Sequence, residues 1–184
     1  MNLSKVDDLK HLIRQLPDYP VKGVIFLDIT PLFKDKNAFS YIIRRQAEYY
    51  KGKNIDVVAG VEARGFIVGS PLAYELGVGF VPIRKPGKLP WKKKRVEYEL
   101  EYGKEAVEVH EDAFYKGESV LLVDDLLATG GTAKAAATLI ESLNARVTGI
   151  SFVVELVHLG GRKKLNGFDV HSLIKYNKQG NSLV

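Results

Sequence analysis

The chain has 184 residues, of which 46% are hydrophobic and 27% charged, proportions typical of a soluble globular domain of ordinary size. It contains no cysteine, which excludes disulfides and thiol nucleophiles and fits a cytoplasmic location. We see no bilayer-spanning apolar stretch and no signal-peptide pattern, so we expect no membrane anchor. The four histidines have no metal-ligand spacing. The formal net charge of +5 permits nucleic-acid binding but also suits a small polyanionic substrate.

The first third of the chain predicts two helices separated by an irregular apolar segment. Residues 6–16 carry apolar side chains at helical spacing, and prolines follow them. Residues 37–50 predict a second helix, with Asn37 as its N-cap. The segment between them, residues 23–33, is apolar without a clear period. It could be a connector that packs in the core or an apolar wall for a flat ligand, and both interpretations stay open.

Two buried strands are predicted next, over residues 55–59 and 79–83, with a helix over residues 67–76 between them. The turn after the first strand contains Arg64. An arginine at such a turn can clamp a phosphate with two hydrogen bonds, although most loop arginines are only solvated. Its place directly after a predicted parallel strand favours the first interpretation.

A cationic loop follows, over residues 84–90. Its proline and glycine content excludes regular structure. It carries Arg84, Lys85 and Lys88, and a basic run continues over residues 92–95. We interpret this region as a mobile cationic lid. A nucleic-acid patch is the weaker alternative, because the single aromatic beside the run is a poor stacking platform.

Residues 96–102 alternate strictly between polar and apolar side chains. Glu97, Glu99 and Glu101 share one face of the predicted strand. Gly103-Lys104 predicts a hairpin turn into a second strand over residues 105–110, so a β-ribbon should project from the core. At least two of the glutamates are expected only to form a wet strand face.

The most informative stretch covers residues 120–132. Residues 120–123 predict a strand buried on both faces of a parallel sheet. Asp124 and Asp125 follow at its carboxyl end, where open α/β sheets bind ligands. A turn of small residues then leads into a predicted helix over residues 133–143.

That turn, Ala128 to Thr132, predicts a phosphate cradle. Backbone N–H groups at the start of a helix have no intrahelical partners, and Gly130 and Gly131 let the backbone approach an anion. Thr129 and Thr132 add hydroxyl donors. The two adjacent carboxylates repel phosphate but can accept hydrogen bonds from vicinal sugar hydroxyls, so the expected ligand is a ribose 5-phosphate.

Two alternatives to this cradle are less favoured. The stretch lacks the glycine-lysine ending of a nucleoside triphosphatase loop and the G-x-G-x-x-G pattern of dinucleotide-binding proteins. The second alternative is a plain helix cap beside two solvated acids. It would explain the turn and the acid pair separately, but not the order of strand, acid pair, turn and helix along the chain.

The remaining pattern completes an α/β protein. Residues 147–156 and 170–176 predict two further strands, with a short basic turn or helix over residues 160–165 between them. Alternating strands and helices predict a central, mainly parallel sheet with helices on both faces, in a single domain over residues 1–184.

Five stretches, taken in order, resemble the motifs of the type I phosphoribosyltransferases, and among them those of the adenine phosphoribosyltransferase family. They are residues 23–26 with 28–31, 62–66, 84–90, 100–103 and 123–132. The resemblance implies the type I phosphoribosyltransferase fold, with a small N-terminal hood over residues 1–35 and a flexible loop and ribbon over residues 84–110.

The resemblance also implies a reaction. The family transfers the 5-phosphoribosyl group of phosphoribosyl pyrophosphate (PRPP) to N9 of adenine and releases AMP and pyrophosphate. It implies Mg²⁺ held mainly by PRPP and water, and a homodimer in which Arg84 reaches a neighbouring subunit's site.

Residue roles follow from the same resemblance. The turn Ala128 to Thr132 would hold the 5-phosphate, and Asp124 and Asp125 the ribose hydroxyls. Pyrophosphate would meet the cationic side chains Arg64, Arg84, Lys85 and Lys88. The loop of Arg64 is expected to contain a cis peptide bond between Glu62 and Ala63.

At the base, Ile25 and Phe26 would face adenine on one side and Leu156 on the other. Glu101 would hydrogen-bond the purine and assist its proton transfer, with Tyr102 nearby. Hypoxanthine-guanine enzymes place an aspartate where Ala128 stands, so the acid–base role moves to Glu101.

Two departures and two alternatives remain. Leu27 stands where many family members have arginine or tyrosine, and the basic run over residues 92–95 exceeds the family pattern; we interpret that run as solvated. The alternative functions are a phosphoribosyltransferase for another purine such as xanthine, or a PRPP-sensing regulator that binds nucleic acid.

Overall fold

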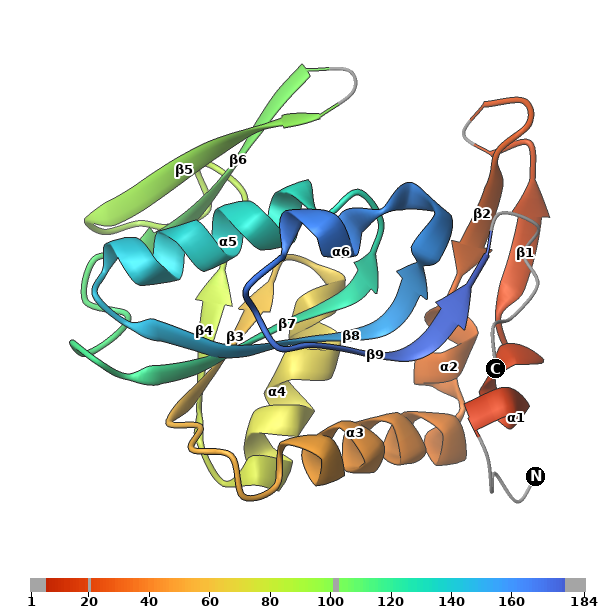
Figure 1. The fold of residues 1–184 in the computed structure, drawn as a ribbon, viewed down its shortest axis with the longest axis horizontal. Helices are drawn as coiled ribbons and strands as arrows, with labels where there is room; N and C mark the ends of the chain where they lie inside the picture. The colour runs from red at the N-terminus through yellow and green to blue at the C-terminus, as the bar shows by residue number, and fades with distance from the viewer. Residues whose placement is uncertain (1–5, 20, 101–102, 178–184) are drawn as a thin grey trace.

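A computed structural model describes residues 6–19, 21–100 and 103–177 of the chain. Its centre is a five-stranded sheet in the order β4-β3-β7-β8-β9, and every neighbouring pair in it is parallel (Figure 1). The strands are β3 (Val57–Val61), β4 (Gly79–Ile83), β7 (Ser119–Leu127), β8 (Arg146–Leu156) and β9 (Val170–Tyr176). The predicted parallel sheet is confirmed.

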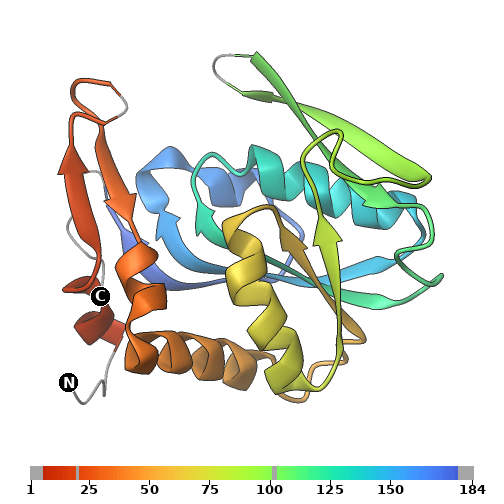
Figure 2. The ribbon, with the colours of Figure 1, turned by 180° about the vertical axis from the view of Figure 1, so that it is seen from behind.

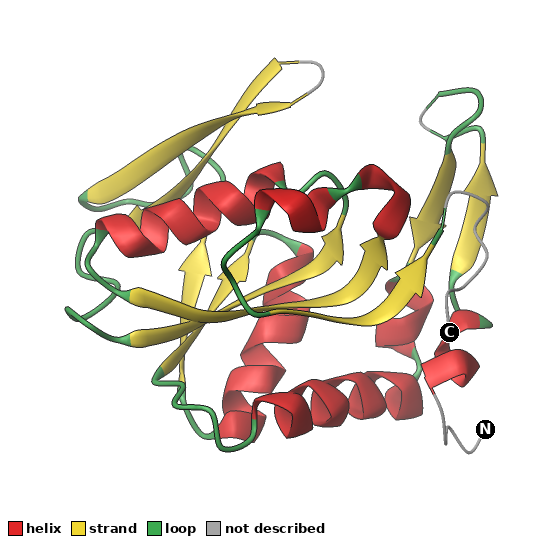
Figure 3. Cartoon of the chain, in the orientation of Figure 1, coloured by secondary structure: helices red, strands yellow, loops and turns green. Residues whose placement is uncertain are grey.

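Helices cover both faces of this sheet (Figure 3). They are α3 (Lys36–Tyr50) and α4 (Arg64–Leu76) on one face and α5 (Gly131–Ser142) on the other. Strand β7 explains the arrangement, because its apolar run alternates between the two cores. Leu121 and Val123 pack with the α3 and α4 side, whereas Val120 and Leu122 pack with the alanine-rich face of α5.

The N-terminal segment differs from its prediction. It contains α1 (Val6–Lys10), β1 (Arg14–Pro17), β2 (Ile25–Asp28) and α2 (Thr30–Lys34). The helix predicted over residues 6–16 is wrong beyond residue 10, because β1 pairs with β2 in an antiparallel hairpin. Two of the apolar residues in the predicted pattern, Leu9 in α1 and Ile13 after it, are buried in the core. Pairing with a distant strand therefore overrides the local pattern.

The N-cap of α3 also differs from its prediction. Asp35, and not Asn37, caps the helix, because its Oδ1 atom accepts hydrogen bonds from the backbone N–H groups of Asn37 and Ala38, at 2.9 Å each.

The ribbon consists of β5 (Lys93–Leu100) and β6 (Gly103–His110), paired antiparallel from Lys93↔His110 to Leu100↔Gly103. The predicted turn at Gly103-Lys104 is therefore wrong, since both residues belong to β6. The basic run is not confined to a loop. It lies in β5, and Lys94 donates a hydrogen bond of 2.9 Å to the backbone oxygen of Ser142, at the end of α5.

The two hairpins rise at opposite ends of the molecule, as seen from both sides (Figures 1 and 2). Between them, on the α5 face, lie the carboxyl end of β8 and the short elements η1 (Val157–Leu159) and α6 (Gly161–Lys164). Among the described helices, none has the length and apolar character needed to cross a membrane.

Candidate functional site

The predicted phosphate cradle lies where β7 passes into α5. Gly130 adopts a left-handed backbone conformation (φ 78°) and stands directly before the first residue of the helix, Gly131. No side chain hydrogen-bonds to this cap, and the first turn of α5 carries no acid. The backbone N–H groups of a twelve-residue helix therefore point at this turn without an acidic side chain beside them.

The cradle is supported from below by the first residue of α6. A Cβ atom on Gly161 would lie 2.2 Å from the backbone oxygen of Ala128 and 2.9 Å from the backbone nitrogen of Gly130. In the same way, a Cβ atom on Gly130 would lie 2.5 Å from the backbone oxygen of Gly161. Only glycine at both positions allows the two backbones to approach this closely.

An ion pair fixes the helix that supplies this support. Arg162 donates two hydrogen bonds to the buried carboxylate of Glu155, at 3.0 and 2.5 Å, and a third of 2.6 Å to the backbone oxygen of Val170. Burial raises the pKa of Glu155, but the hydrogen bonds from Arg162 and Ser172, together with the charges of Arg162 and Lys175, hold it below its ordinary value. Sequence patterns did not reveal this support; a glycine pair followed by an arginine after a buried strand was the only signal.

The acid pair lies beside the cradle in the C-terminal half of β7. The strand continues to Leu127, so its predicted end at residue 123 is wrong. Asp125 is almost fully buried, and its Oδ2 atom lies 2.8 Å from the Nε atom of Arg64. Asp124 accepts a hydrogen bond of 2.8 Å from the backbone N–H of Asp125. Burial raises the pKa of both carboxyl groups, and the charge of Asp125 raises that of Asp124 further. The start of α4 approaches so closely that a Cβ atom on Gly65 would lie 3.0 Å from Asp124 Oδ1.

Arg64 is the first residue of α4, and the expected cis peptide bond between Glu62 and Ala63 is present just before it. The structure thus brings Arg64 together with the acid pair. Its partner here is Asp125, so an incoming anion would have to share or replace that partner.

The other predicted cations lie beyond β4, and two of them are paired. Arg84 donates two hydrogen bonds of 3.1 Å to the carboxylate of Glu62, and the backbone N–H of Lys85 donates a third at 2.9 Å. These bonds, led by those from Arg84, lower the pKa of Glu62. Lys88 is exposed, and its backbone oxygen accepts from Arg84 at 3.4 Å. Glu62 was not singled out as a functional residue, although it lies in one of the motifs.

A polar network joins the ribbon to both regions. The ammonium group of Lys85 pairs with Glu105 of β6, which also accepts a hydrogen bond of 2.7 Å from the hydroxyl of Tyr98. The hydroxyl of Thr132, in the predicted cradle, donates to Tyr98 at 3.2 Å. Sequence analysis did not single out Tyr98 or Glu105, because nothing local links them to a residue on α5.

Two of the predicted base-binding residues, Ile25 and Phe26, are neighbours in β2, and Leu156 is the last residue of β8. Ile25 and Leu156 line one cavity of about 350 Å³, together with Leu27 and residues of η1. Phe26 does not line it and instead packs edge-on against Tyr19, with ring centroids 5.2 Å apart. The cavity favours the apolar-wall interpretation of residues 23–33. It leaves the role of Phe26 a prediction.

The predicted catalytic residue Glu101 and its neighbour Tyr102 lie outside the described residues. The alternation expected around them is present in β5: Glu97 and Glu99 are exposed, whereas Val96 and Tyr98 are half-buried. Within the described part of the chain, no group of three or more His, Asp or Glu side chains is arranged to hold a metal ion.

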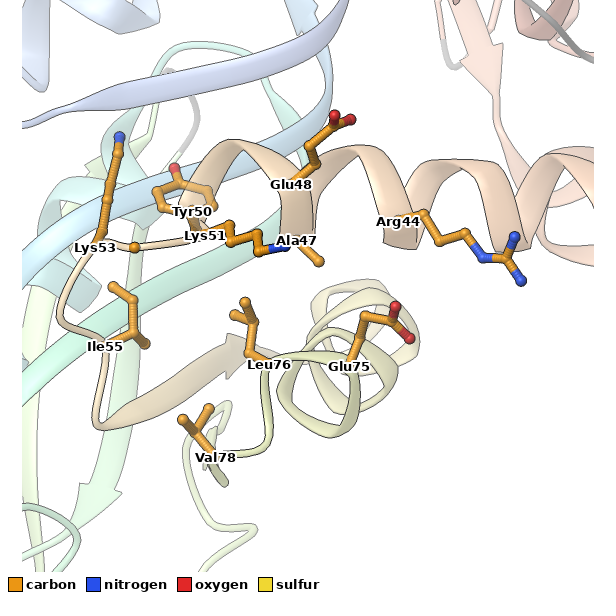
Figure 4. A pocket seen from close by; sticks show the side chains of 11 residues that line it. Arg44, Ala47, Glu48, Tyr50, Lys51, Lys53, Ile55, Glu75, Leu76 and Val78 are labelled. Atoms are coloured by element: carbon orange, nitrogen blue, oxygen red, sulfur yellow. The ribbon is translucent and has the colours of Figure 1, made fainter.

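A larger cavity, of about 550 Å³, lies at the other end of the sheet, between the ends of α3 and α4 (Figure 4). Its wall mixes the cations Arg44 and Lys51 with the acids Glu48 and Glu75, and Figure 4 shows the guanidinium of Arg44 directed away from the centre. It lies at the amino end of β3, far from the acid pair along the strands. The size of a cavity alone therefore does not identify the site.

A family model described as the phosphoribosyl transferase domain matches residues 25–178. The chain belongs to the phosphoribosyl transferase family. An adenine phosphoribosyltransferase of Caldanaerobacter subterraneus subsp. tengcongensis is 56% identical over 171 residues, which cover 93% of this chain and 99% of that protein. The predicted membership and fold are confirmed.

Solved structures agree with these relatives. The adenine phosphoribosyltransferase of Thermoanaerobacter pseudethanolicus superimposes with a TM-score of 0.91 at 54% identity, over 94% of this chain and 100% of that one. The enzyme of Saccharomyces cerevisiae gives a TM-score of 0.86 at 41% identity, over 91% and 97% of the two chains. That enzyme was crystallised with adenine and an imino-altritol bisphosphate. The predicted enzyme class, that of the adenine phosphoribosyltransferases, is confirmed by these relatives.

Proposed function

We propose that this protein transfers the 5-phosphoribosyl group of PRPP to N9 of adenine, forming AMP and pyrophosphate in purine salvage. One observation carries the proposal: a carboxyl pair and an uncapped helix N-terminus meet at the end of β7, in a chain similar throughout to adenine phosphoribosyltransferases. The bisphosphate and adenine bound by the yeast relative are the ligand chemistry that such a site would take.

Each part of PRPP has a proposed partner. The N–H groups at the start of α5, with the hydroxyls of Thr129 and Thr132, hold the 5-phosphate. Asp124 and Asp125 accept hydrogen bonds from the ribose hydroxyls. Loss of pyrophosphate leaves positive charge on the ribose and negative charge on the leaving group, and Arg64 and the cations beyond β4 stabilise the latter.

Adenine enters beside the hood. We assign the apolar contacts of the base to Ile25, Phe26 and Leu156, of which Ile25 and Leu156 line the cavity beside β2. N9 must lose its proton as the new bond forms, and we assign that proton to Glu101, with Tyr102 beside the base. The ribbon and the cationic loop limit the access of water, which would otherwise hydrolyse PRPP.

A divalent cation fits this arrangement. Its oxygen donors would be mainly those of PRPP and water, because the described residues include no group of three or more His, Asp or Glu side chains that could hold the ion. Bound Mg²⁺ would neutralise charge on the leaving group. The protein's own residues orient the ribose, the 5-phosphate and the pyrophosphate of PRPP around the ion.

We also propose a homodimer, in which Arg84 reaches toward the partner's site, and a cytoplasmic location. The mass in solution, measured by light scattering, tests the first of these. Binding of nucleic acid is disfavoured, because three cations of the basic run are engaged: Lys93 with Glu108, Lys94 with Ser142, and Arg95 with Glu97.

The deciding experiment mixes the protein with PRPP, Mg²⁺ and each of adenine, hypoxanthine, guanine and xanthine, and separates the nucleotides formed. AMP from adenine is expected to exceed the other products. Absence of AMP would refute the proposal, whereas a higher yield from xanthine would support the alternative purine.

The ribose assignment predicts that Asp124→Asn with Asp125→Asn weakens PRPP binding. Two charge-assisted hydrogen bonds are weakened, so we expect the Kd, measured by calorimetry, to rise on the order of 10- to 100-fold. Glu111→Gln with Asp112→Asn removes two exposed charges and is the matched control. An unaltered Kd in the first variant would contradict the assignment.

A further inference from the structure

Tyr98 is the only ribbon residue, among those described, whose side chain hydrogen-bonds to the proposed 5-phosphate cradle. Its hydroxyl accepts from Thr132 Oγ1 at 3.2 Å and donates to Glu105 Oε2 at 2.7 Å. Its ring lies over the start of α5, where a Cβ atom on Gly131 would be 3.5 Å from the ring. The side chain is half-buried and packs with the α5 core. Its hydroxyl therefore occupies one fixed place beside Thr132.

Each hydroxyl group in this network has a single proton, so it can donate only one hydrogen bond at a time. Thr132 has one hydroxyl proton. Because the Tyr98 proton goes to the Glu105 carboxylate, which can only accept, the Thr132 proton is directed to Tyr98. A bound phosphate offers only acceptor oxygens, so it needs that same proton. Once Thr132 donates to phosphate, its oxygen can only accept from Tyr98. The Tyr98 proton can then turn from Glu105 to Thr132, because Lys85, whose ammonium group lies 3.5 Å from the Tyr98 hydroxyl, remains the partner of Glu105.

We propose that Tyr98 is a positioning residue for the 5-phosphate, whose hydroxyl reverses its hydrogen bond with Thr132 when the phosphate binds and so holds the Thr132 hydroxyl toward it. This inference rests on the proposed function.

The protonation state of Tyr98 agrees with this role. Burial, followed by the carboxylate of Glu105, raises the pKa of the Tyr98 hydroxyl above its ordinary value. The hydroxyl therefore keeps its proton at neutral pH and remains able to donate to either neighbour.

The test compares two ligands that differ only in the 5-phosphate. Calorimetry gives the Kd of AMP and of adenosine for the wild type, Tyr98→Phe, Thr132→Val and the double variant. We expect Tyr98→Phe to weaken AMP about tenfold, the size of one hydrogen bond, and to leave adenosine within twofold. The double variant should bind AMP no more weakly than Thr132→Val alone, because Tyr98 acts through Thr132.

Two further variants separate positioning from general damage. Thr132→Ser keeps a hydroxyl, so it should retain AMP binding and keep the tenfold response to Tyr98→Phe. Tyr115→Phe removes the hydroxyl of a tyrosine that is 81% exposed and should change neither Kd. Phenylalanine keeps the ring over Gly131, and equal urea midpoints would show that the fold is retained.

Three results would overturn the inference: unchanged AMP binding by Tyr98→Phe, an equal loss for AMP and adenosine, or additive effects in the double variant. Failure of the proposed function is recognised separately, because the wild type would then not prefer AMP over adenosine at all.

Discussion

Ala128 and the two acids before it decide where the proton chemistry of the site can lie. Asp125 is paired with Arg64, and Asp124 accepts a backbone hydrogen bond from its neighbour. Ala128 offers no acid at the turn. The proton that leaves adenine N9 is therefore assigned to a group on the base side, and Glu101 is the predicted one.

That assignment gives a sharp prediction. Glu101→Gln should lower kcat on the order of 100-fold, the usual effect of losing a general base, while the Kd of PRPP stays unchanged. Glu99→Gln is the matched control, because Glu99 is an exposed glutamate two residues earlier in the ribbon. Steady-state rates and calorimetry measure the two quantities. Equal kcat values for the two variants would mean that Glu101 belongs only to the wet face of the strand.

For individual residues, the sequence predicted which site residues lie together only where they are close to one another in the chain. The acid pair and the cradle follow one another within nine residues, so strand and helix propensities were enough to place them together. Tyr98 and Thr132 are 34 residues apart, and Arg84 and Glu62 are 22 apart. Their contacts depend on the order of strands in the sheet and on the docking of the ribbon, which no local pattern encodes.

Among the elements, α6 supports the predicted phosphate cradle through its backbone. Its first residue meets the backbone of Ala128 and Gly130, and Arg162 ties the helix to β8 through Glu155. The cradle is thus held between α5 and α6, and its shape depends on a contact that involves two backbones and no side chain.

Gly161→Ala should therefore weaken the binding of PRPP, although Gly161 is not one of the predicted ligand-binding residues. Its Cβ atom would lie 2.2 Å from a backbone oxygen, so the loop must shift, and we expect a loss of stability of about 1 to 3 kcal/mol. The Kd of PRPP should rise on the order of tenfold. Gly79→Ala is the control, because its Cβ atom would meet only Val57, at an ordinary 3.7 Å. Urea unfolding and calorimetry measure the two effects; equal behaviour of both variants would contradict the support role.

Elements were predicted well where burial and spacing agree, as in β4, β8 and β9. Elements were predicted poorly where pairing with another strand determines the secondary structure. Residues 14–17 became a strand because β2 lies beside them, and residues 93–95 joined the ribbon because β6 pairs with them. The charge of the basic run suggested a solvated lid, yet Lys94 binds the carboxyl end of α5, where a cation is favourable.

For the whole molecule, His171 links stability to pH. It lies on β9, and its ring stacks on Tyr49 of α3, with centroids 4.0 Å apart. Burial lowers its pKa to about 4, although Asp169 opposes the shift. The unfolded chain, with a histidine pKa of about 6.5, binds more protons between these two values, so the free energy of unfolding must fall as pH decreases through this window.

We expect this group to reduce the free energy of unfolding by about 1 to 2 kcal/mol between pH 7 and pH 5, allowing for the part of the ring that reaches water. His171→Phe should keep the stacking and remove that part of the pH dependence. His11→Phe, at an exposed position, should leave it in place. Urea unfolding at both pH values gives the comparison, and an unchanged pH dependence in His171→Phe would refute the linkage.

The pairing of Arg84 with Glu62 has a consequence for turnover. Glu62 is an anion built into the protein, held against a cation that we assign to pyrophosphate. We therefore expect Glu62 to act as an intramolecular competitor, which replaces the departing product and speeds its dissociation. Glu62→Gln should tighten pyrophosphate severalfold as a product inhibitor and lower kcat where release limits the rate. Weaker product inhibition in this variant would mean that Glu62 orients Arg84 for the ligand and does not compete with it.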